Sequence, residues 1–314
     1  MTTATAPLPQ RAPPSPGSVR AWLLACRPAT LTAALAPVAV GSAIAARFSS
    51  LDVGAFLATM LGASLLQIAS NFANDVFDYE KGADTHERLG PMRAVQAGLL
   101  TAGQMKTGLL IVIGLSLLAG LFLTFHAGWP VIAIGVSGII AAVAYTGGPY
   151  PLGYHGWGDV FVFLFFGLVA VCGTSFVQLG HVPTLAILCS IPIGALATNI
   201  LVVNNLRDRH TDQIAQKRTL AVRFGKNAIL AQYIVQLSLA YGLPLWLWLS
   251  DKEPAWILLP WLSLPLALAA LRSVCTKEGA ALNASLVASA RLVFVFGMLL
   301  ALGLVFGQQH LAQP

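Results

Sequence analysis

Residues 53–84 read VGAFLATMLGASLLQIASNFANDVFDYEKGAD, so a long apolar segment runs directly into a cluster of amide and carboxylate side chains. The apolar part, Val53 to Ala73, contains no charged residue, and a membrane-spanning helix takes roughly 20 such residues. The polar positions recur at helical spacing and share one helix face. They are Gln67, Asn71, Asn74, Asp75 and Asp78. The pattern predicts a transmembrane helix that carries a polar stripe to one membrane surface.

The rest of the chain has the same apolar character. Of its 314 residues, 57% are hydrophobic and 10% are charged, whereas a soluble domain is about a quarter charged. Nine apolar stretches have the length and composition of membrane spans. They run from Ala29 to Ala46, Val53 to Ala73, Thr107 to Phe125, Trp129 to Tyr145, Asp159 to Leu179, Thr184 to Val203, Ala228 to Leu249, Pro254 to Leu271 and Leu286 to Phe306. We therefore predict an all-α, polytopic membrane protein with about nine transmembrane helices.

Basic residues are distributed unequally between the predicted loops. With the N-terminus in the cytoplasm, 15 of the 18 Lys and Arg residues fall on that side, Arg47 and Lys252 fall outside, and Arg291 begins the last span. Cytoplasmic loops of membrane proteins carry such an excess. We expect a multi-pass protein of the cell inner membrane, with the N-terminus and polar loops cytoplasmic and the C-terminus outside. Because topology accounts for the net charge of +6, no nucleic-acid partner is expected.

The first 18 residues are rich in Pro, Thr and Ser and hold no long apolar segment. This composition is typical of a disordered tail and not of a cleaved signal peptide. We expect residues 1–18 to be a cytoplasmic tail and residues 19–314 to form one intramembrane domain.

A second acidic segment follows the sixth predicted span, where residues 204–218 read NNLRDRHTDQIAQKR. Asp208 and Asp212 lie about one helical turn apart. Together the two segments, the first extended to Glu87, hold seven of the 12 acidic residues of the chain, and the predicted topology places both on the same side of the membrane. Solvated loops are the simple alternative, but Asn and Asp on a membrane helix are costly without a functional partner.

The clustered side chains indicate a particular chemistry. Carboxylates that lie close together repel one another unless a cation sits between them, and ligands that are all oxygen suit Mg²⁺ better than Zn²⁺. Basic residues beside the acidic ones could hold a diphosphate by charge-assisted hydrogen bonds. These residues are Lys81, Arg93, Arg207, Lys217 and Arg218. Acid, base and membrane together point to a lipid diphosphate as substrate.

Both segments resemble the signatures of the UbiA-type intramembrane prenyltransferase superfamily, an N-D-x-x-D-type first loop and a D-x-x-x-D second loop between apolar helices. The resemblance covers the chain from Arg20 onward, and further stretches are similar to the 1,4-dihydroxy-2-naphthoate polyprenyltransferase branch of menaquinone synthesis. They are Arg27-Pro28-x-Thr30-Leu31, Pro37-Val38-x-x-Gly41, Asn71-x-x-Asn74-Asp75-x-x-Asp78-Tyr79-x-x-Gly82-x-Asp84-Thr85, Gly90-Pro91-x-Arg93-Ala94-Val95-Gln96-x-Gly98, Tyr145-Thr146-Gly147-Gly148-Pro149, and Asn204-Asn205-x-Arg207-Asp208 with Lys217-Arg218-Thr219-Leu220. Gln216, where that branch has glycine, and Asp159, where it more often has glutamate, depart from the pattern.

The resemblance implies Mg²⁺-dependent transfer of a polyprenyl group from polyprenyl diphosphate to 1,4-dihydroxy-2-naphthoate, giving demethylmenaquinol in menaquinone biosynthesis. The implied metal ligands, of which the four aspartates other than Asp84 are also the implied catalytic residues, are Asn74, Asp75, Asp78, Asp84, Asp208 and Asp212. The implied substrate-binding residues are Asn71, Arg93, Tyr145, Asn204, Arg207, Lys217 and Arg218. Membrane lipid is the expected surrounding of the prenyl chain.

Two alternatives stay open at this point. The same chemistry could act on another aromatic acceptor, 4-hydroxybenzoate or homogentisate, because the acceptor site cannot be located by residue. A membrane transporter is a second alternative, since nine spans with polar residues could also move a solute. The loop tyrosines Tyr145, Tyr150 and Tyr154 could contact a cation or the flat acceptor, although tyrosines also serve as interfacial anchors.

Overall fold

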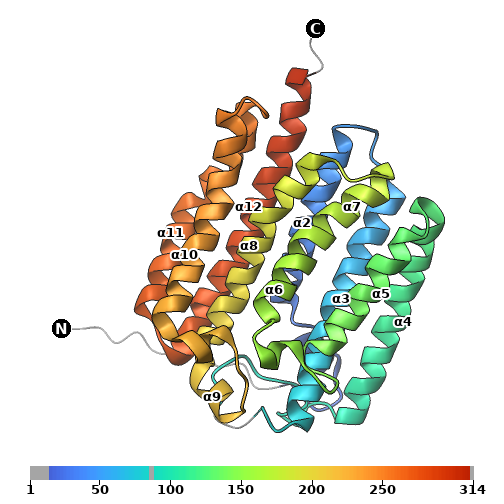
Figure 1. Ribbon diagram of the computed structural model, residues 1–314. Coiled ribbons are helices and arrows are strands. Elements are labelled where there is room, and N and C mark those ends of the chain that lie inside the picture. The colour runs from blue at the N-terminus through green and yellow to red at the C-terminus, as the bar shows by residue number, and fades with distance from the viewer. Residues whose placement is uncertain (1–13, 85–87, 312–314) are drawn as a thin grey trace.

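The computed structural model describes residues 14–84 and 88–311, and within these ranges every regular element is a helix. The α-helices are α1 Val19–Cys26, α2 Pro28–Ala46, α3 Val53–Glu80, α4 Ala102–Ala127, α5 Pro130–Ala144, α6 Gly158–Val162, α7 Ala170–Leu179, α8 Thr184–Arg207, α9 Arg209–Ile214, α10 Leu220–Leu249, α11 Leu264–Thr276 and α12 Leu282–Leu311. The short helices are η1 Leu152–His155, η2 Phe163–Val169, η3 Ala255–Ser263 and η4 Gly279–Ala281. Most of the long helices run side by side as one bundle (Figure 1).

Eight segments of the described chain are long and apolar enough to cross a membrane, which confirms the predicted multi-pass helical bundle. The fourth predicted span, residues 129–145, is the shorter helix α5. Its 15 residues extend about 22 Å along the helix axis, less than the roughly 30 Å of a hydrocarbon layer. It packs against α3 and α4, so the predicted nine segments are present and one of them is short.

Helix α3 continues beyond the predicted apolar span and ends at Glu80. Its 28 residues reach about 42 Å, so the polar stripe remains helical and extends past the apolar layer. Helix α10 likewise begins at Leu220, before the predicted start at Ala228, but its backbone is interrupted at Gly225, where φ is 77° and ψ is 179°. The uninterrupted part of α10 therefore matches the predicted span.

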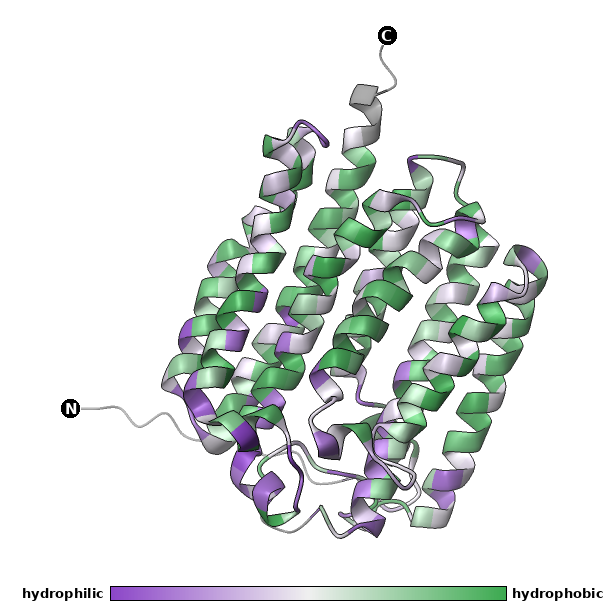
Figure 2. Ribbon diagram, viewed as in Figure 1, coloured by the Kyte–Doolittle hydropathy of each residue, from purple (hydrophilic) through white to green (hydrophobic). Residues whose placement is uncertain are grey.

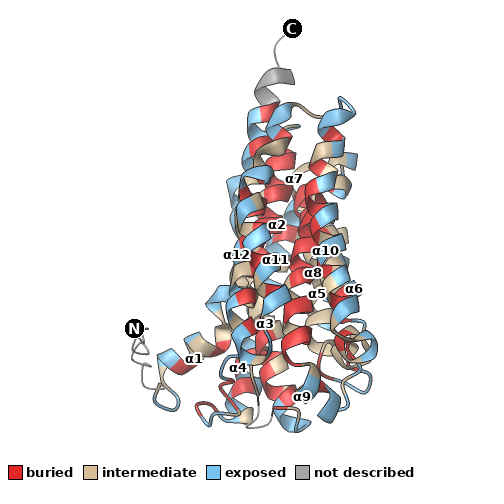
Figure 3. Cartoon of the chain, turned by 90° about the vertical axis from the view of Figure 1, so that its left-hand side faces the viewer, coloured by how far each residue is buried: buried red, intermediate tan, exposed pale blue. Residues whose placement is uncertain are grey.

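The largest apolar core contains buried side chains of α2, α7, α8, α10, η3, α11 and α12. Ile44 of α2, Leu196 of α8, Tyr233 of α10 and Phe296 of α12 are almost completely buried in it. Helix α8 passes through the interior of the bundle, and most of its residues are buried (Figure 3). Because α8 ends in the second acidic segment, this core fixes where that segment lies.

Two glycines allow neighbouring helices to approach closely, as the small residues of the sequence suggest. A Cβ atom on Gly41 of α2 would lie 2.5 Å from the carbonyl oxygen of Val171 in α7. A Cβ atom on Gly167 of η2 would lie 2.8 Å from the Cα atom of Gly194 in α8. Neither contact leaves room for a side chain.

Hydrophilic residues gather at one end of the bundle, around the end of α3, the end of α8 and helix α9 (Figure 2). Helix α1 lies at this polar end (Figure 3), and α12 runs away from it to the opposite end (Figure 1). Of the predicted tail, residues 1–13 lie outside the described residues. The described part joins the bundle, since the N–H of Gly17 donates to the carbonyl of Leu99 at 2.8 Å and Ser18 caps α1.

Candidate active site

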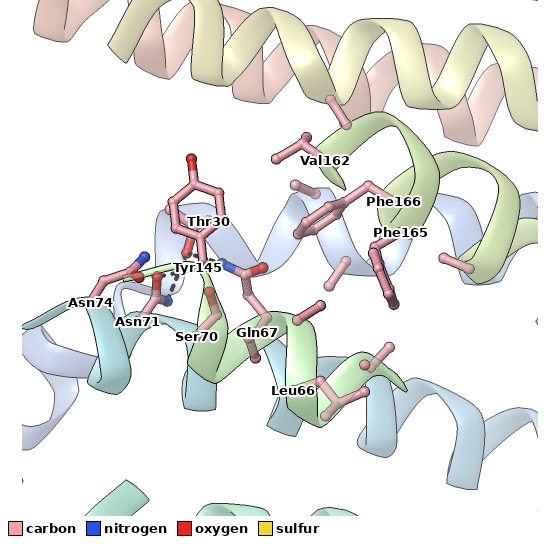
Figure 4. A pocket seen from close by; sticks show the side chains of 18 of the residues that line it. Thr30, Leu66, Gln67, Ser70, Asn71, Asn74, Tyr145, Val162, Phe165 and Phe166 are labelled. Carbon is pink, nitrogen blue, oxygen red and sulfur yellow. Dashed lines mark hydrogen bonds between the residues drawn. The ribbon is translucent and has the colours of Figure 1, made fainter. Parts of the chain in front are cut away.

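A cavity of about 1290 Å³ opens within the bundle at this polar end. Every α-helix of the described residues except α10 and α11 contributes to its lining, together with η1, η2 and the loops that follow α3, α5 and α9. Figure 4 shows that one side of the cavity is polar and the other is apolar. The polar side holds Gln67, Asn71, Asn74 and Tyr145, and the apolar side holds side chains such as Phe165. The cavity therefore suits a ligand with a polar head and an apolar tail.

The structure brings most of the predicted site residues to this cavity. Those that line it are Asn71, Asn74, Asp78, Arg93, Tyr145, Asn204, Asp208, Asp212 and Lys217. They come from α3, from the loops after α3, α5 and α9, and from α8 and α9. The two acidic segments, more than 120 residues apart in the sequence, thus face one space.

Asp78 is a carboxylate of the site that accepts hydrogen bonds from three side chains. Its Oδ2 atom accepts from Nη2 of Arg93 at 2.8 Å, and its Oδ1 atom accepts from Nζ of Lys217 at 3.1 Å and from the hydroxyl of Tyr154 at 2.8 Å. Only 2% of Asp78 is exposed. Three chain segments therefore meet on one buried carboxylate.

Tyr154 also contacts both neighbouring lysines through its ring. The Nζ atoms of Lys217 and Lys81 lie 4.6 Å and 5.0 Å from the ring centroid, within the range of cation–π attraction. Burial raises the pKa of the Tyr154 hydroxyl, and the Asp78 carboxylate raises it further. The sequence indicated this tyrosine as one of three possible loop contacts, and the structure distinguishes it from Tyr150, which is exposed and stacks on His155.

Arg207, a predicted diphosphate ligand, does not line the cavity. Its buried guanidinium donates to both carboxylate oxygens of Asp208, at 2.8 Å and 2.6 Å, and to the side-chain oxygens of Asn204 and Asn283. Asn283 in turn donates to the carbonyl of Leu89. Arg207 therefore orients Asp208 and Asn204 and ties α8 to α12 and to the loop after α3.

Three further predicted residues also lie outside the cavity lining. Asp75 accepts from the backbone N–H groups of Ala94 at 2.9 Å and Val95 at 3.1 Å, so both of its oxygens hold the loop after α3. Asp84 pairs with Arg88 and, at 3.2 Å, with Arg93. Arg218 is exposed. The geometry thus does not support direct ligand contacts for Asp75, Arg207 and Arg218.

Two carboxyl groups outside the membrane spans are held in unusual states. Burial raises the pKa of Asp84, although Arg93 and Arg88 lower it. Burial also raises the pKa of Asp212 to about 7, against the effect of Lys217, and the carboxylates of Asp208 and Asp78 raise it further. The negative charges of Asp208 and Asp78 therefore disfavour the ionised form of Asp212, and a bound cation would reduce this repulsion.

The donor set can be tested against a divalent metal. Among the described residues no group of three or more His, Cys, Asp or Glu side chains is arranged to hold a metal ion by itself. Mg²⁺, however, is usually held by one or two carboxylates together with the phosphates of its substrate. Asp78, Asp208 and Asp212 line one cavity with the amide of Asn74, so the residues fit Mg²⁺ bound with a diphosphate.

Two residues near the site were left without a definite role by the sequence. Asp159 of α6 is buried and accepts from Nε2 of Gln232 in α10 at 2.8 Å, outside the cavity lining. Arg291 of α12 is exposed and lines the cavity. Asn74 gains a partner that the sequence did not indicate, because the hydroxyl of Thr146 donates to its side-chain oxygen at 2.9 Å.

Comparisons with known proteins agree with this geometry. The chain is 39% identical over 230 residues to 1,4-dihydroxy-2-naphthoate octaprenyltransferase of Haemophilus influenzae, covering 71% of this chain and 75% of that protein. It is 39% identical over 254 residues to the protein of the same name from Mycobacterium leprae, covering 81% of this chain and 85% of that protein. The fold is also similar to the solved structure of a UbiA homolog from Archaeoglobus fulgidus bound to DMAPP and Mg²⁺, with 14% identity, a TM-score of 0.63 and coverage of 89% of this chain and 98% of that one.

A family profile covers most of the chain. The UbiA prenyltransferase family matches residues 34–294, a range that includes the cavity helices α3 to α8 and both acidic segments. Together with the two relatives, this match identifies the chain as a membrane polyprenyltransferase that belongs to the UbiA prenyltransferase family.

Proposed function

We propose that the protein transfers a polyprenyl group from polyprenyl diphosphate to 1,4-dihydroxy-2-naphthoate, a step of menaquinone biosynthesis that gives demethylmenaquinol. The observation that carries this proposal is the convergence of both acidic segments and Lys217 at the polar side of a cavity whose other side is apolar. The names of the relatives supply the acceptor. A prenyl diphosphate has the matching division into a charged head and an apolar tail.

The diphosphate would bind at the polar side together with Mg²⁺. Asp78, Asp208 and Asp212 are the carboxylates placed to hold the metal, and Asn74 is the amide placed beside them. Bound there, Mg²⁺ would neutralise charge on the departing diphosphate. We do not expect Asp75 and Asp84 to contact the metal directly, because the loop after α3 occupies the oxygens of Asp75 and arginines pair with Asp84.

Two basic side chains are placed to orient the leaving group. Lys217 and Arg93 both line the cavity and reach Asp78, so they can exchange this carboxylate for diphosphate oxygens. Charge-assisted hydrogen bonds of this kind position the substrate and stabilise negative charge as the bond to the allylic carbon breaks. The rings of Tyr145 and Tyr154 also line the cavity and could face the allylic cation.

The apolar side of the cavity would hold the prenyl chain and exclude water from the allylic cation. Val162, Phe165 and Phe166 form part of this lining (Figure 4). Small residues at Gly135 and Gly138 of α5 also lie along it, which leaves width for an isoprenoid. Membrane lipid is the expected surrounding of the outer end of that chain.

The same proposal places the protein in the cell inner membrane with its polar end in the cytoplasm. Support comes from the excess of Lys and Arg in the loops at that end. Fusion of a reporter that is active only outside the cytoplasm to the C-terminus tests this orientation. Activity of that reporter is expected, and activity of a cytoplasmic reporter in its place would reverse the orientation.

The enzymatic proposal is tested with purified protein, radiolabelled polyprenyl diphosphate, Mg²⁺ and one acceptor at a time. We expect a prenylated naphthoquinol from 1,4-dihydroxy-2-naphthoate, no product after EDTA, and recovery when Mg²⁺ is restored. Asp208→Asn should remove activity, whereas Asn283→Ala, which removes hydrogen bonds to Arg207 and to the carbonyl of Leu89 but no cavity side chain, should reduce it less. Product from 4-hydroxybenzoate or homogentisate alone would retain the chemistry and overturn the acceptor.

A further inference from the structure

Among the cationic side chains that line the cavity, Arg27 has a buried N–H group that none of the contacts described above uses. Arg27 lies between α1 and α2 and lines the cavity. Its Nη2 atom is buried and has no hydrogen-bond partner among the described residues. A buried N–H group of a charged side chain is costly when it has no partner, so this arrangement points to a ligand that supplies the missing negative charge.

The backbone at Arg27 is also unusual. Its φ of 50° and ψ of 67° lie in the left-handed region, which non-glycine residues seldom adopt. The strain is of the order of 1 kcal/mol or more. It ends α1 and begins α2 at one residue, and it places the side chain of Arg27 in the cavity wall. Strained residues of this kind concentrate at ligand sites.

The neighbouring charges do not neutralise Arg27. Burial lowers the pKa of its guanidinium, and the guanidinium groups of Arg93 and Arg88 lower it further, whereas Asp75 and Asp84 raise it. Both of these carboxylates already have partners, since Asp75 holds two backbone N–H groups and Asp84 pairs with Arg88 and Arg93. The charge of Arg27 is therefore left for a ligand.

An unpaired acceptor belongs to the same corner of the cavity. The Oε1 atom of Gln67 is buried without a partner among the described residues, while its Nε2 atom donates to Thr30 at 3.3 Å and to Asn71 at 3.4 Å. Thr30 donates to the carbonyl of Arg27 at 2.9 Å. Hydrogen bonds through Thr30 thus join Gln67 to the backbone of Arg27, and Figure 4 shows Thr30, Gln67 and Asn71 side by side. The Nη2 atom of Arg27 is the free donor of this segment, and Oε1 of Gln67 is the free acceptor.

The free donor of Arg27 and the free acceptor of Gln67 suit one of the two anionic substrates of the proposed reaction, the prenyl diphosphate and the aromatic hydroxy acid, better than the other. A diphosphate carries several negative charges and no donor group at neutral pH, so it needs metal and several cations and offers nothing to the Gln67 oxygen. An aromatic hydroxy acid carries one carboxylate, which matches one guanidinium, and a hydroxyl, which can donate to Gln67. Gln67 also lies 11 residues before Asp78 on α3, about 16 Å along the helix axis, so the two anions have room to bind in the cavity at the same time.

We propose that Arg27 and Gln67 form the subsite for the aromatic acceptor, with the Arg27 guanidinium on its carboxylate and the Gln67 oxygen on its neighbouring hydroxyl. This inference rests on the proposed function for the identity of the acceptor. It assigns recognition of the acceptor to the α1–α2 junction and α3, whereas the diphosphate head is held by Asp78, Asp208, Asp212 and Lys217.

The test measures binding without turnover, using three probes on the purified protein in the presence of Mg²⁺. They are 1-hydroxy-2-naphthoate, 1-naphthol, which lacks the carboxylate, and geranyl diphosphate. Wild type should bind 1-hydroxy-2-naphthoate at least tenfold more tightly than 1-naphthol. Arg27→Gln should remove this preference, a loss of about 10- to 100-fold for a charge-assisted pair, and should leave the affinity for geranyl diphosphate within about twofold.

Two further variants separate recognition from folding. Arg272→Gln removes an exposed arginine of α11 outside the cavity and should change none of the three affinities. With 2-naphthoate, which lacks the hydroxyl, added as a fourth probe, Gln67→Leu should weaken the binding of 1-hydroxy-2-naphthoate more than that of 2-naphthoate. If Arg27→Gln weakens geranyl diphosphate and spares 1-hydroxy-2-naphthoate, Arg27 belongs to the diphosphate site and the proposal is wrong.

Turnover, measured in parallel, keeps this proposal distinct from the proposed function. Suppose that wild type and Arg27→Gln bind 1-hydroxy-2-naphthoate equally and that product forms from 1,4-dihydroxy-2-naphthoate. This result would contradict the proposed subsite and support the proposed reaction. Arg27-dependent binding of 1-hydroxy-2-naphthoate without any product would retain a carboxylate subsite and remove the proposed acceptor.

Discussion

The carboxylate of Asp75 accepts a hydrogen bond from the backbone N–H of Ala94 at 2.9 Å, and its second oxygen accepts from the next residue along the chain. Asp75 is only 1% exposed. A side chain that the sequence assigns to a metal thus fixes the path of the loop after α3, and this loop carries Arg93 to Asp78.

Replacing Asp75 should therefore affect stability before it affects metal binding. Asp75→Asn keeps one acceptor and brings an N–H group against a backbone N–H, which should cost about 2 kcal/mol of unfolding free energy. Thermal unfolding in detergent measures this loss. Mg²⁺-dependent binding of geranyl diphosphate by the folded protein should persist in Asp75→Asn and fail in Asp208→Asn. Loss of that binding at unchanged stability would instead make Asp75 a metal ligand.

Lys217 and Arg218 are adjacent in sequence but should behave differently. Lys217 lines the cavity, whereas Arg218 is exposed outside it. Lys217→Gln should raise the KM for the diphosphate donor by about 10- to 100-fold, as expected for loss of a charged hydrogen-bond donor. Arg218→Gln should change it by less than about threefold. Steady-state kinetics with a fixed acceptor concentration measure both, and equal effects would contradict this assignment of the two side chains.

Asp212 predicts how Mg²⁺ binding depends on pH. Its raised pKa of about 7 means that in the metal-free protein the carboxyl is protonated below this pH and ionised above it. Since a metal binds the ionised form, the apparent affinity for Mg²⁺ should rise as pH increases from about 6 to 7 and level off near pH 8. Calorimetry at several pH values measures this change. Asp212→Asn should flatten the profile, and a profile of the same slope in that variant would assign the titration to another group.

The same raised pKa makes a prediction for stability without metal. The folded protein holds the Asp212 proton more tightly than the unfolded chain, whose Asp groups titrate near pH 4. Asp212 therefore contributes stability at low pH, and this contribution is lost as pH rises toward and through 7. Melting curves in EDTA at pH 5 and pH 8, compared with those of Asp212→Asn, measure the difference.

Gly41 and Gly114 provide a matched test of packing. A Cβ atom on Gly41 would lie 2.5 Å from the carbonyl oxygen of Val171, whereas one on Gly114 of α4 would have no neighbour within 4 Å. Gly41→Ala should destabilise the bundle by about 1–3 kcal/mol. Gly114→Ala should be neutral or slightly stabilising, because alanine favours the helix by up to about 1 kcal/mol. Thermal unfolding that ranks the two variants in the opposite order would contradict this packing.

Hydropathy was sufficient to predict the spans because lipid imposes the same demand on every one of them. The convergence of Asp78 with Asp208 and Asp212 was also predictable, since both acidic segments end apolar helices on the same predicted side. The direction of individual side chains was not predictable. Lys217 enters the cavity and Arg207 does not, because Arg207 is held by Asn283 on α12, 76 residues away.

The role of Arg27 was also not predictable from the sequence. Its motif was recognised in the sequence, but its exposure to the cavity depends on a left-handed backbone at one residue and on two carboxylates that are already engaged elsewhere. Neither condition has a local signal. Long-range contacts decide which charged groups are satisfied within the protein and which remain for a ligand.

The contacts of Asp78 also bear on how a substrate enters. Lys217 and Arg93 pair with this carboxylate, and the hydroxyl of Tyr154 donates to it. Under the proposed function, a diphosphate would take over these two cations, and the Mg²⁺ that accompanies it would take over the carboxylate that they release. Metal and diphosphate binding together would then leave every charge paired, whereas either one alone would leave a charge unpaired.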